Sequence, residues 1–355
     1  MRIYNIALYP GDGIGIEVTK EAVRVLRAVE DVFNDVKFEF QEFNWGSRYW
    51  QETGKVAPDN FLDTLKDFDA ILLGSLGDPE NVPDHITLVP LIQMRQSFDQ
   101  YICLRPAKLL PGITSPLANK KFGDIHILVV RENSEGEYAD IGGRFKSYQT
   151  DEVSIQTSIH TRKGVERVLR YAFKLAQDRT GRIALATKSN ALKHSMVLWD
   201  EAFANISKEF PNVKGEKFHV DAITMHFVRC PERFDVVVGS NLFCDILSDL
   251  SGAITGSIGL APSANINPER KYPSLFEPVH GSAPDIQGKG IANPIAAIRS
   301  GAMILDFLGE SEAAKCIEDA VINNLVAGKI RTPDIGGDAT TEEVGTDITE
   351  WVKKS

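Results

Sequence analysis

The sequence predicts an α/β protein built on a large, mostly parallel sheet, and three observations indicate it. Strand-like and helix-like segments alternate from end to end of the 355 residues. Residues 68–74 and 125–130 are nearly continuous apolar runs, which is typical of buried strands. The length corresponds to about two domains of roughly 100–200 residues each, facing each other across a cleft.

The chain opens with a predicted strand at residues 2–9, a glycine-rich turn at 10–15 and a helix. The helix is predicted by an apolar stripe at i, i+4, i+7, i+8 and i+11, made by Val18, Ala22, Val25, Leu26 and Val29. The turn lacks the dinucleotide fingerprint G-x-G-x-x-G, because Ile16 stands where the last glycine belongs. A tight strand-to-helix turn is therefore favoured over a Rossmann site.

Polar residues follow the predicted strands 68–74 and 125–130, at the strand ends where open α/β sheets bind ligands. Residues 153–159 alternate apolar and polar side chains, which predicts a half-exposed strand able to pair with another subunit. Residues 251–263 are rich in Gly, Ser and Ala, as in a crossover or loop. The remaining predicted elements are helices at 165–176, 196–206, 294–308 and 313–325, the last capped by Gly328, and strands at 183–187 and 234–239.

Composition excludes several classes of function. Apolar residues make up 43% of the chain and charged residues 25%, as in ordinary globular proteins. Lys and Arg number 39 against 49 Asp and Glu, so the net charge of -10 disfavours nucleic-acid binding. No apolar run approaches the roughly 20 residues of a membrane span, and the first residues do not read as a signal peptide. Four scattered cysteines fit a reducing cytosol, so we expect a cytoplasmic protein.

Two charged clusters suggest chemistry. Arg95, Arg105 and Arg131 would select a small polyanionic substrate if they converged, although each alone could be a surface arginine. Asp245 and Asp249 share one helix face at i and i+4 and could hold Mg²⁺ or Mn²⁺; the alternative is a solvated acidic face.

Three further residues are candidates of a different kind. Lys188 follows the strand at 183–187 and could relay a proton near a divalent cation. Tyr138 could donate a proton to a developing carbanion. Asp285, in the glycine-containing turn of residues 277–286, could accept both ribose hydroxyls of an adenosine.

Six ordered blocks of this sequence resemble one family, the β-decarboxylating dehydrogenases of 3-isopropylmalate, isocitrate and tartrate or D-malate. The blocks are residues 10–15, 104–106, 130–138, 187–190, 240–249 and 277–286, so the resemblance spans nearly the whole chain. It implies a two-domain fold on a large mixed sheet that is not a Rossmann fold. Residues 1–98 and 255–355 would form a discontinuous cofactor-binding domain, and residues 99–254 a central substrate, metal and dimerisation domain of a homodimer.

The resemblance also implies cofactors and roles. NAD would be preferred over NADP, because the carboxylate of Asp285 would repel a 2′-phosphate. The implied cofactor-binding residues are Glu277, His280, Gly281, Ser282, Ala283, Asp285, Ile286 and Asn293. Arg95, Arg105 and Arg131 would bind substrate carboxylates. Mn²⁺ or Mg²⁺ would be held by Asp245, Asp249 and, from the other subunit, Asp221, which also borders the substrate.

The implied catalytic residues are Lys188, from across the dimer, and Tyr138. Lys188 would help to remove the hydroxyl proton, and Tyr138 would protonate the enolate. K⁺ is allowed as a further cofactor.

Substrate choice depends on the segment before Arg95. Leu88 stands where isopropylmalate enzymes resembling this stretch carry glutamate, and Val89 and Leu91 stand where isocitrate enzymes carry serine and asparagine. Residues 82–88 and 97–101, with Trp45, instead resemble the tartrate and decarboxylating D-malate dehydrogenase branch. Cys103 replaces an expected polar residue such as asparagine, and Cys244 an expected glycine.

The sequence therefore predicts an NAD- and metal-dependent oxidoreductase acting, with or without decarboxylation, on a small 2-hydroxy diacid such as D-malate or tartrate. A 3-isopropylmalate dehydrogenase is the alternative, and an isocitrate dehydrogenase is less favoured. A silent regulatory subunit is disfavoured because Tyr138, Lys188 and the three aspartates are all present.

Overall fold

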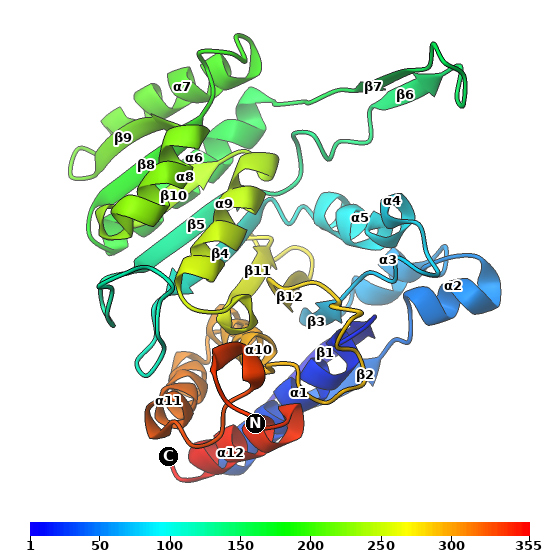
Figure 1. Cartoon of the computed structure of the whole chain (residues 1–355), viewed down its shortest axis with the longest axis vertical. Helices are drawn as coiled ribbons and strands as arrows, with labels where there is room; N and C mark the ends of the chain where they lie inside the picture. Colours follow the sequence, from blue (N-terminus) through cyan, green and yellow to red (C-terminus); the bar gives the residue numbers. More distant parts are fainter.

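A single ten-stranded sheet runs through the whole molecule in the computed structural model, which describes all 355 residues (Figure 1). Its strand order is β2-β1-β3-β12-β11-β4-β5-β10-β8-β9, and six of the nine pairings are parallel. The strands are β1 (Arg2–Gly11), β2 (Val36–Glu42), β3 (Ala70–Ser75), β4 (Ile102–Lys108), β5 (His126–Glu132), β8 (Arg182–Thr187), β9 (Lys214–His219), β10 (Val236–Gly239), β11 (Pro262–Ile266) and β12 (Ser274–Pro278). The prediction of a large, mostly parallel sheet is confirmed.

The three antiparallel pairings lie together at the centre of the sheet, where β11 pairs with β12 and β4, and β4 pairs with β5. On one side of the β11–β4 boundary every strand comes from residues 1–98 or 255–355, and on the other side every strand comes from residues 99–254. The sheet therefore joins two halves of the molecule through the antiparallel pairing of β11 with β4.

Twelve α-helices pack around the sheet. Alternating strand residues point to opposite faces of the sheet, and they show which helices cover each face. Val236 and Val238 of β10 pack in the same apolar cluster as α6 and α7, whereas Val237 packs with α8 and α9 on the opposite face. The helices are α1 (Gly15–Val32), α2 (Ser47–Thr53), α3 (Phe61–Leu65), α4 (Asp84–Thr87), α5 (Val89–Ser97), α6 (Arg162–Asp178), α7 (Ser195–Ile206), α8 (Val220–Arg229), α9 (Asn241–Ile254), α10 (Ile295–Leu308), α11 (Ser311–Ala327) and α12 (Thr341–Lys353). No helix combines the length and apolar character that crossing a membrane requires.

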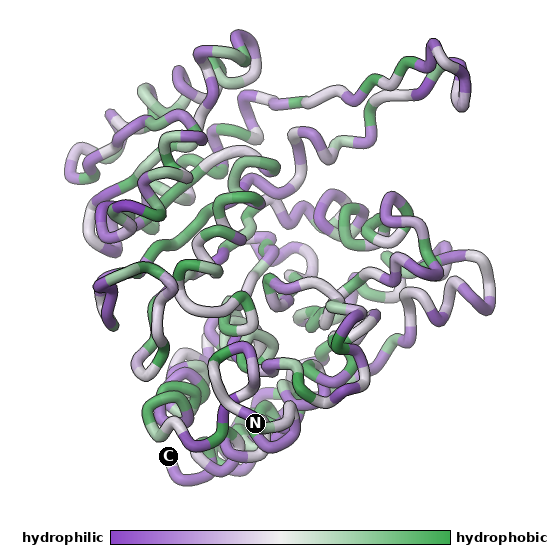
Figure 2. The backbone as a smooth tube through the Cα atoms, in the orientation of Figure 1, coloured by the Kyte–Doolittle hydropathy of each residue, from purple (hydrophilic) through white to green (hydrophobic).

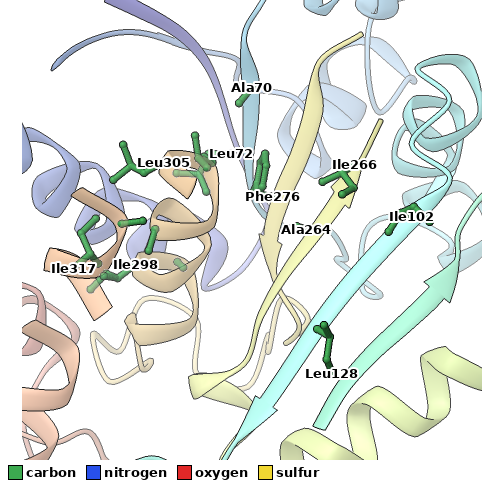
Figure 3. Packing of buried hydrophobic residues seen from close by; sticks show 14 of the residues in the cluster. Ala70, Leu72, Ile102, Leu128, Ala264, Ile266, Phe276, Ile298, Leu305 and Ile317 are labelled. Carbon is green, nitrogen blue, oxygen red and sulfur yellow. The ribbon is translucent and has the colours of Figure 1, made fainter. Parts of the chain in front are cut away.

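In the half formed by residues 1–98 and 255–355, the largest apolar cluster packs α10 and α11 against the strands. Figure 2 shows the apolar stretches gathered along the strands and the inward sides of the helices. In the close-up, Ile298 and Leu305 of α10 lie beside Leu72 of β3 and Phe276 of β12 (Figure 3). Because nearly every side of α10 is buried, this helix is the central support of the half that carries β11 and β12.

Two predicted segments differ from the structure. Only residues Val153–Gln156 form a strand, β7, which pairs with β6 (Gly142–Phe145) in a hairpin that projects from the molecule (Figure 1). All four β7 residues are exposed, so the expected half-exposed strand is wrong for a single chain, because no element of this chain covers either face. Its pairing with another subunit stays a prediction. The crossover or loop expected at residues 251–263 is shorter than predicted: α9 extends to Ile254, a 3-10 helix covers Ile258–Leu260, and β11 begins at Pro262.

The glycine turn before α1 docks onto the loop after β12. Ile14 N donates a hydrogen bond of 2.8 Å to the carbonyl oxygen of Ser282. Gly13 lies at φ +58°, and a Cβ there would overlap the same carbonyl oxygen. Glycine is therefore required both by the backbone conformation and by the close approach of two loops.

We expect Gly13→Ala to lower the free energy of unfolding by about 2–4 kcal/mol, of which about 1 kcal/mol is backbone strain and the rest steric overlap. The matched control is Gly54→Ala, since Gly54 has φ +74° but nothing within 4 Å of the methyl group that alanine would add. The control should lose only about 1 kcal/mol in denaturant unfolding. Equal losses in the two variants would contradict the close approach.

Candidate active site

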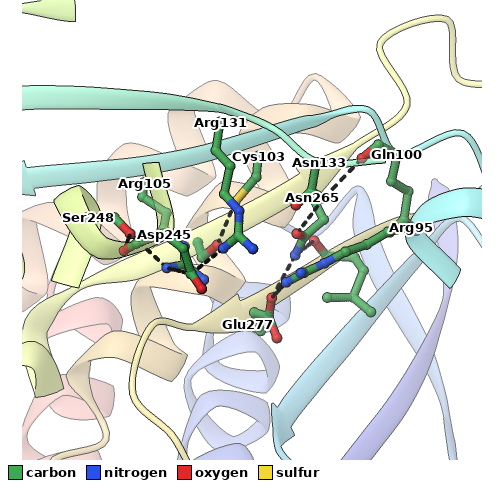
Figure 4. Close-up of polar contacts among 12 residues, drawn as sticks. Arg95, Gln100, Cys103, Arg105, Arg131, Asn133, Asp245, Ser248, Asn265 and Glu277 are labelled. Carbon is green, nitrogen blue, oxygen red and sulfur yellow. Dashed lines mark hydrogen bonds and ion pairs between the residues drawn. The ribbon is translucent and has the colours of Figure 1, made fainter. Parts of the chain in front are cut away.

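A cavity of about 200 Å³ lies where the two halves of the sheet meet, and it gathers residues from distant parts of the chain. Arg95 reaches it from α5, Arg105 from β4 and Arg131 from β5. Tyr138, from the turn after β5, and Asp245, from α9, also line it. The structure thus brings together the three arginines whose convergence the spacing could not establish (Figure 4).

Arg131 is the most deeply buried of the three guanidinium groups, with 1% of the residue exposed. Its Nε and Nη2 atoms donate to Asn241 Oδ1 at 3.0 and 2.6 Å, and its Nη1 atom pairs with Asp245. Asn241 begins α9 directly after β10, and sequence reasoning did not assign it a role. Its only sequence signal is an amide side chain at the start of a helix that follows a buried strand.

Arg105 connects the two predicted metal-binding aspartates. Its Nη1 atom donates to Asp245 Oδ1 at 3.1 Å, to Ser248 Oγ at 2.7 Å and to Asp249 Oδ1 at 3.5 Å. The three acceptors lie on one face of α9, as the i and i+4 spacing of the aspartates predicts. Arg105 and Arg131 therefore share the Asp245 carboxylate.

The surroundings shift the pKa values of the two aspartates in opposite directions. Burial alone would raise the pKa of Asp245, but the Arg131 and Arg105 guanidiniums outweigh burial and lower that pKa. Burial raises the pKa of Asp249, with the Asp245 charge in support, although Arg105 opposes the shift. Asp245 is consequently a fixed anion, and its charge is already divided between two cations.

Tyr138 is held against Asp245. Its Oη atom donates to Asp245 Oδ2 at 2.9 Å, and the Arg131 guanidinium carbon lies 5.5 Å from the ring centroid. Burial and the Asp245 charge raise the pKa of the Tyr138 phenol above its ordinary value of 10.0. The phenol therefore stays protonated at neutral pH and is available as a proton donor at the cavity wall.

Arg95 forms an ion pair with Glu277, a residue that sequence reasoning placed among the cofactor ligands. The Arg95 Nη2 atom lies 3.0 Å from Glu277 Oε1, and both side chains are less than a tenth exposed. The Nε atom of Arg95 is buried without a hydrogen-bond partner. Glu277 also lines the cavity, so it faces the same space as the three arginines.

Lys188 and Asp221 do not reach this cavity within one chain. They pair with each other, with Lys188 Nζ 2.5 Å from Asp221 Oδ1, and the Asp221 side chain is 67% exposed. No group of three His, Cys, Asp or Glu side chains in the chain is arranged to hold a metal ion. Any site that uses Asp221 together with Asp245 and Asp249 therefore needs a second copy of the chain.

The residues expected to bind NAD lie on and after β12, and their surroundings differ. His280 and Gly281 line the cavity, and His280 Nε2 is buried without a hydrogen-bond partner. Burial lowers the pKa of His280, so this imidazole is neutral at neutral pH. Asp285 is exposed, whereas Asn293 is buried and donates to Asp334 Oδ2 at 3.0 Å.

The other three residues of this set are placed by packing. The Ser282 side chain is buried, Ala283 adopts φ +40°, and Ile286 packs against the main apolar cluster. A second, open cavity of about 440 Å³ lies beside this loop, between the turn at Gly11–Gly13 and the residues Pro284 and Gln287. The loop thus borders two hollows.

The remaining wall of the first cavity is apolar. Leu88, Leu91 and Ile92 from the segment before Arg95 line it, together with Leu73 and Leu76. The two unexpected cysteines lie behind the wall: Cys103 and Cys244 are fully buried and do not line the cavity. Their thiols contact Ser263 Oγ at 3.4 Å and the Val130 carbonyl oxygen at 3.7 Å, respectively.

Comparison with known proteins defines the class. Residues 5–349 match the family described as "Isocitrate/isopropylmalate dehydrogenase", and the chain belongs to this family. The chain is accordingly an oxidoreductase, and the resemblance expected from six sequence blocks is confirmed.

Individual relatives show which members of the family the chain resembles. The chain is 51% identical to D-malate dehydrogenase [decarboxylating] of Escherichia coli (strain K12), over 98% of each protein. It is 49% identical to tartrate dehydrogenase/decarboxylase of Pseudomonas putida, over 99% of this chain and 98% of the relative. Among solved structures, isocitrate dehydrogenase from Methylococcus capsulatus matches with a TM-score of 0.88 and 37% identity over 99% of both chains. The isocitrate dehydrogenase-like fold is confirmed.

We expect Arg131→Met to lower the free energy of unfolding by about 3–5 kcal/mol, because it removes one partner from a buried ion pair and leaves Asn241 Oδ1 without its donors. Arg162→Met is the control, since Arg162 pairs with Glu201 at 3.1 Å on the surface, where both side chains are about half exposed. Denaturant unfolding should register a loss within about 1 kcal/mol for the control. A similarly small loss for Arg131→Met would show that the buried pair does not stabilise the folded chain.

Proposed function

We propose that this protein catalyses the NAD- and divalent-metal-dependent oxidation, with or without β-decarboxylation, of a small 2-hydroxy diacid such as D-malate or tartrate. The observation that carries the proposal is the convergence of Arg95, Arg105 and Arg131 with Tyr138 and Asp245 on one small cavity. Relatives named for D-malate and tartrate support the choice of substrate.

The charges of the cavity favour a dianion. Three buried guanidiniums meet the carboxylates of Asp245 and Glu277, while Asp249 is more exposed and only distantly paired with Arg105. The buried positive charge exceeds the buried negative charge, and an imbalance of this kind is relieved by an anionic ligand. Guanidinium forks match carboxylates in a bidentate manner, so the two ends of a diacid are suitable ligands.

The chemistry of the donor set fits Mg²⁺ or Mn²⁺. Asp245 and Asp249 offer hard oxygen atoms on one helix face, and Asp221 of a second copy would complete the set. When bound, the cation supplies Lewis-acid stabilisation of charge on the substrate hydroxyl and on the enolate. A cation would compete with Arg105 and Arg131 for the Asp245 carboxylate, which would free guanidinium donors for the substrate.

Two residues of the chain would move protons. Tyr138 keeps its proton at neutral pH, and its hydroxyl lies at the cavity wall, where it can protonate a carbanion-like centre. Lys188 would enter from the second copy and help to remove the hydroxyl proton. Lys188 and Asp221 would enter the site together, because they already form a salt bridge within one chain.

The loop of residues 280–286 would bind NAD. The buried His280 Nε2 atom without a partner fits a polar ligand atom, and the neighbouring cavity offers room for a nucleotide. The exposed carboxylate of Asp285 would accept ribose hydroxyls and would repel a 2′-phosphate. When bound, NAD supplies the hydride acceptor.

A homodimer would place the two half-sites together. The exposed hairpin β6–β7 carries Ile141, Phe145, Val153 and Ile155 at or beside its strands, and Met225 and Ile246 are exposed on α8 and α9. Exposed apolar side chains of this number fit a surface covered by another chain. In this arrangement residues 99–254 would form the dimerisation domain, and residues 1–98 with 255–355 the cofactor-binding domain.

A 3-isopropylmalate dehydrogenase is the second candidate, favoured by the apolar wall of Leu88, Leu91 and Ile92. This wall could receive an isopropyl group. A C4 diacid has no such group and would contact the wall only through its carbon chain. The two candidates differ in substrate size and share the arginines.

The test is a panel of NADH-formation assays with D-malate, tartrate, 3-isopropylmalate and isocitrate, each with Mn²⁺ and with EDTA. We expect D-malate or tartrate to give the highest kcat/KM, EDTA to abolish turnover, and NADP to replace NAD poorly. A higher kcat/KM with 3-isopropylmalate would favour the second candidate. Turnover that is unaffected by metal removal would contradict the proposed role of Asp245 and Asp249.

A further inference from the structure

A buried chain of amides links Arg95 to the other half of the molecule. We propose that Asn265 is a positioning residue: by holding Glu277 it fixes the Arg95 guanidinium at the wall of the substrate cavity. The proposal rests on the proposed function, in which Arg95 binds a substrate carboxylate, and assigns a role to a residue that does not itself line the cavity.

The contacts form one continuous path (Figure 4). Asn133 Nδ2 donates to Asn265 Oδ1 at 2.9 Å, and Asn265 Nδ2 donates to Glu277 Oε1 at 2.8 Å. The same Glu277 oxygen accepts the Arg95 Nη2 donor at 3.0 Å. Asn133 Nδ2 also donates to the Gln100 carbonyl oxygen at 3.0 Å, which anchors the far end of the path.

Burial fixes the orientation of the amide groups along this path. Asn265 is fully buried and Asn133 is 2% exposed, so neither amide can exchange its protein partners for bulk water. Asn265 accepts on its oxygen and donates on its nitrogen, and the flipped amide would set oxygen against oxygen at Glu277. One orientation of Asn265 therefore satisfies both neighbours.

The position of the Arg95 guanidinium depends on Glu277 and, through it, on Asn265. Glu277 is the only hydrogen-bond partner of the Arg95 guanidinium, whose Nε atom is buried and unpaired. The Glu277 carboxylate in turn is held at Oε1 by Asn265 on the adjacent strand β11. Loss of the Asn265 amide would leave Arg95 and Glu277 free to adopt other rotamers, and the substrate would have to reorder them on binding.

The path also joins the two halves of the sheet. Asn265 and Glu277 lie on β11 and β12, whereas Asn133 follows the β5 strand that carries Arg131. Asn265 thus sets the position of Arg95 relative to Arg131, the spacing on which recognition of a two-carboxylate ligand depends. Neither arginine alone encodes that spacing.

The experiment compares Asn265→Leu with the control Asn324→Leu. Asn324 is a buried asparagine of α11 that donates to Asp347 Oδ2 at 2.9 Å, away from the cavity. We expect Asn265→Leu to raise KM for the hydroxy diacid, and Kd for D-malate in calorimetry with Mn²⁺, by about tenfold or more, with a smaller change in kcat. The control should lose stability but keep the wild-type KM and Kd.

A double-mutant cycle with Arg95→Met separates positioning from packing. If Asn265 acts through Arg95, adding Asn265→Leu to Arg95→Met should change Kd for D-malate by less than about twofold. A full second increment would overturn the proposal, as would a wild-type Kd in Asn265→Leu itself.

Asn265→Asp covers the case in which the leucine variant does not fold. It keeps the shape of the side chain but faces Glu277 with an acceptor, so it should weaken D-malate binding at least as much; wild-type binding would overturn the proposal. Because Kd is measured without turnover, a wild type that binds D-malate but oxidises no hydroxy diacid of the panel refutes the proposed function and leaves this test intact. A wild type that binds no hydroxy diacid overturns both.

Discussion

The burial of three guanidinium groups around one cavity is the constraint on which the rest of the site depends. Buried charges are tolerated only when they are paired and hydrogen-bonded. Arg131 and Arg105 divide the Asp245 carboxylate between them, and Arg95 has only Glu277. The site of a single chain therefore holds more buried positive than buried negative charge, and an anionic ligand would reduce this excess.

The sheet makes this arrangement possible. Its central antiparallel pairings bring β12, β11, β4 and β5 side by side, so that residues far apart in sequence face one space. Two of the arginines come from β4 and β5, which lie in one half, and Arg95 comes from a helix of the other half. The distance between the halves consequently sets the distance from Arg95 to Arg105 and Arg131, the residues proposed to bind the substrate.

Much of this could be predicted from the sequence, for identifiable reasons. The helix of residues 15–32 was predictable because its apolar stripe is local and regular. Arg131 could be singled out because it stands at the end of a buried apolar run, but its convergence with Arg95 and Arg105 follows from the order of the strands, which spacing does not specify. The Asn265–Glu277 contact was not predictable, since it depends on a register between β11 and β12 that no local pattern specifies. The exposure of β7 also escaped the pattern, because alternation reports two kinds of face and does not say which chain covers the apolar one.

The claim that the cavity is one half of a site completed by a second copy is tested most directly by subunit complementation. Tyr138→Phe and Lys188→Ala would each inactivate their own homodimer. A mixture refolded or exchanged into heterodimers would contain one site with an intact Tyr138 and an intact Lys188 from different chains. The account predicts recovery of about a quarter of the wild-type NADH-forming activity, because about half of the dimers are mixed and each has one complete site. A mixture in which heterodimers form but remain as inactive as the two parents would contradict it.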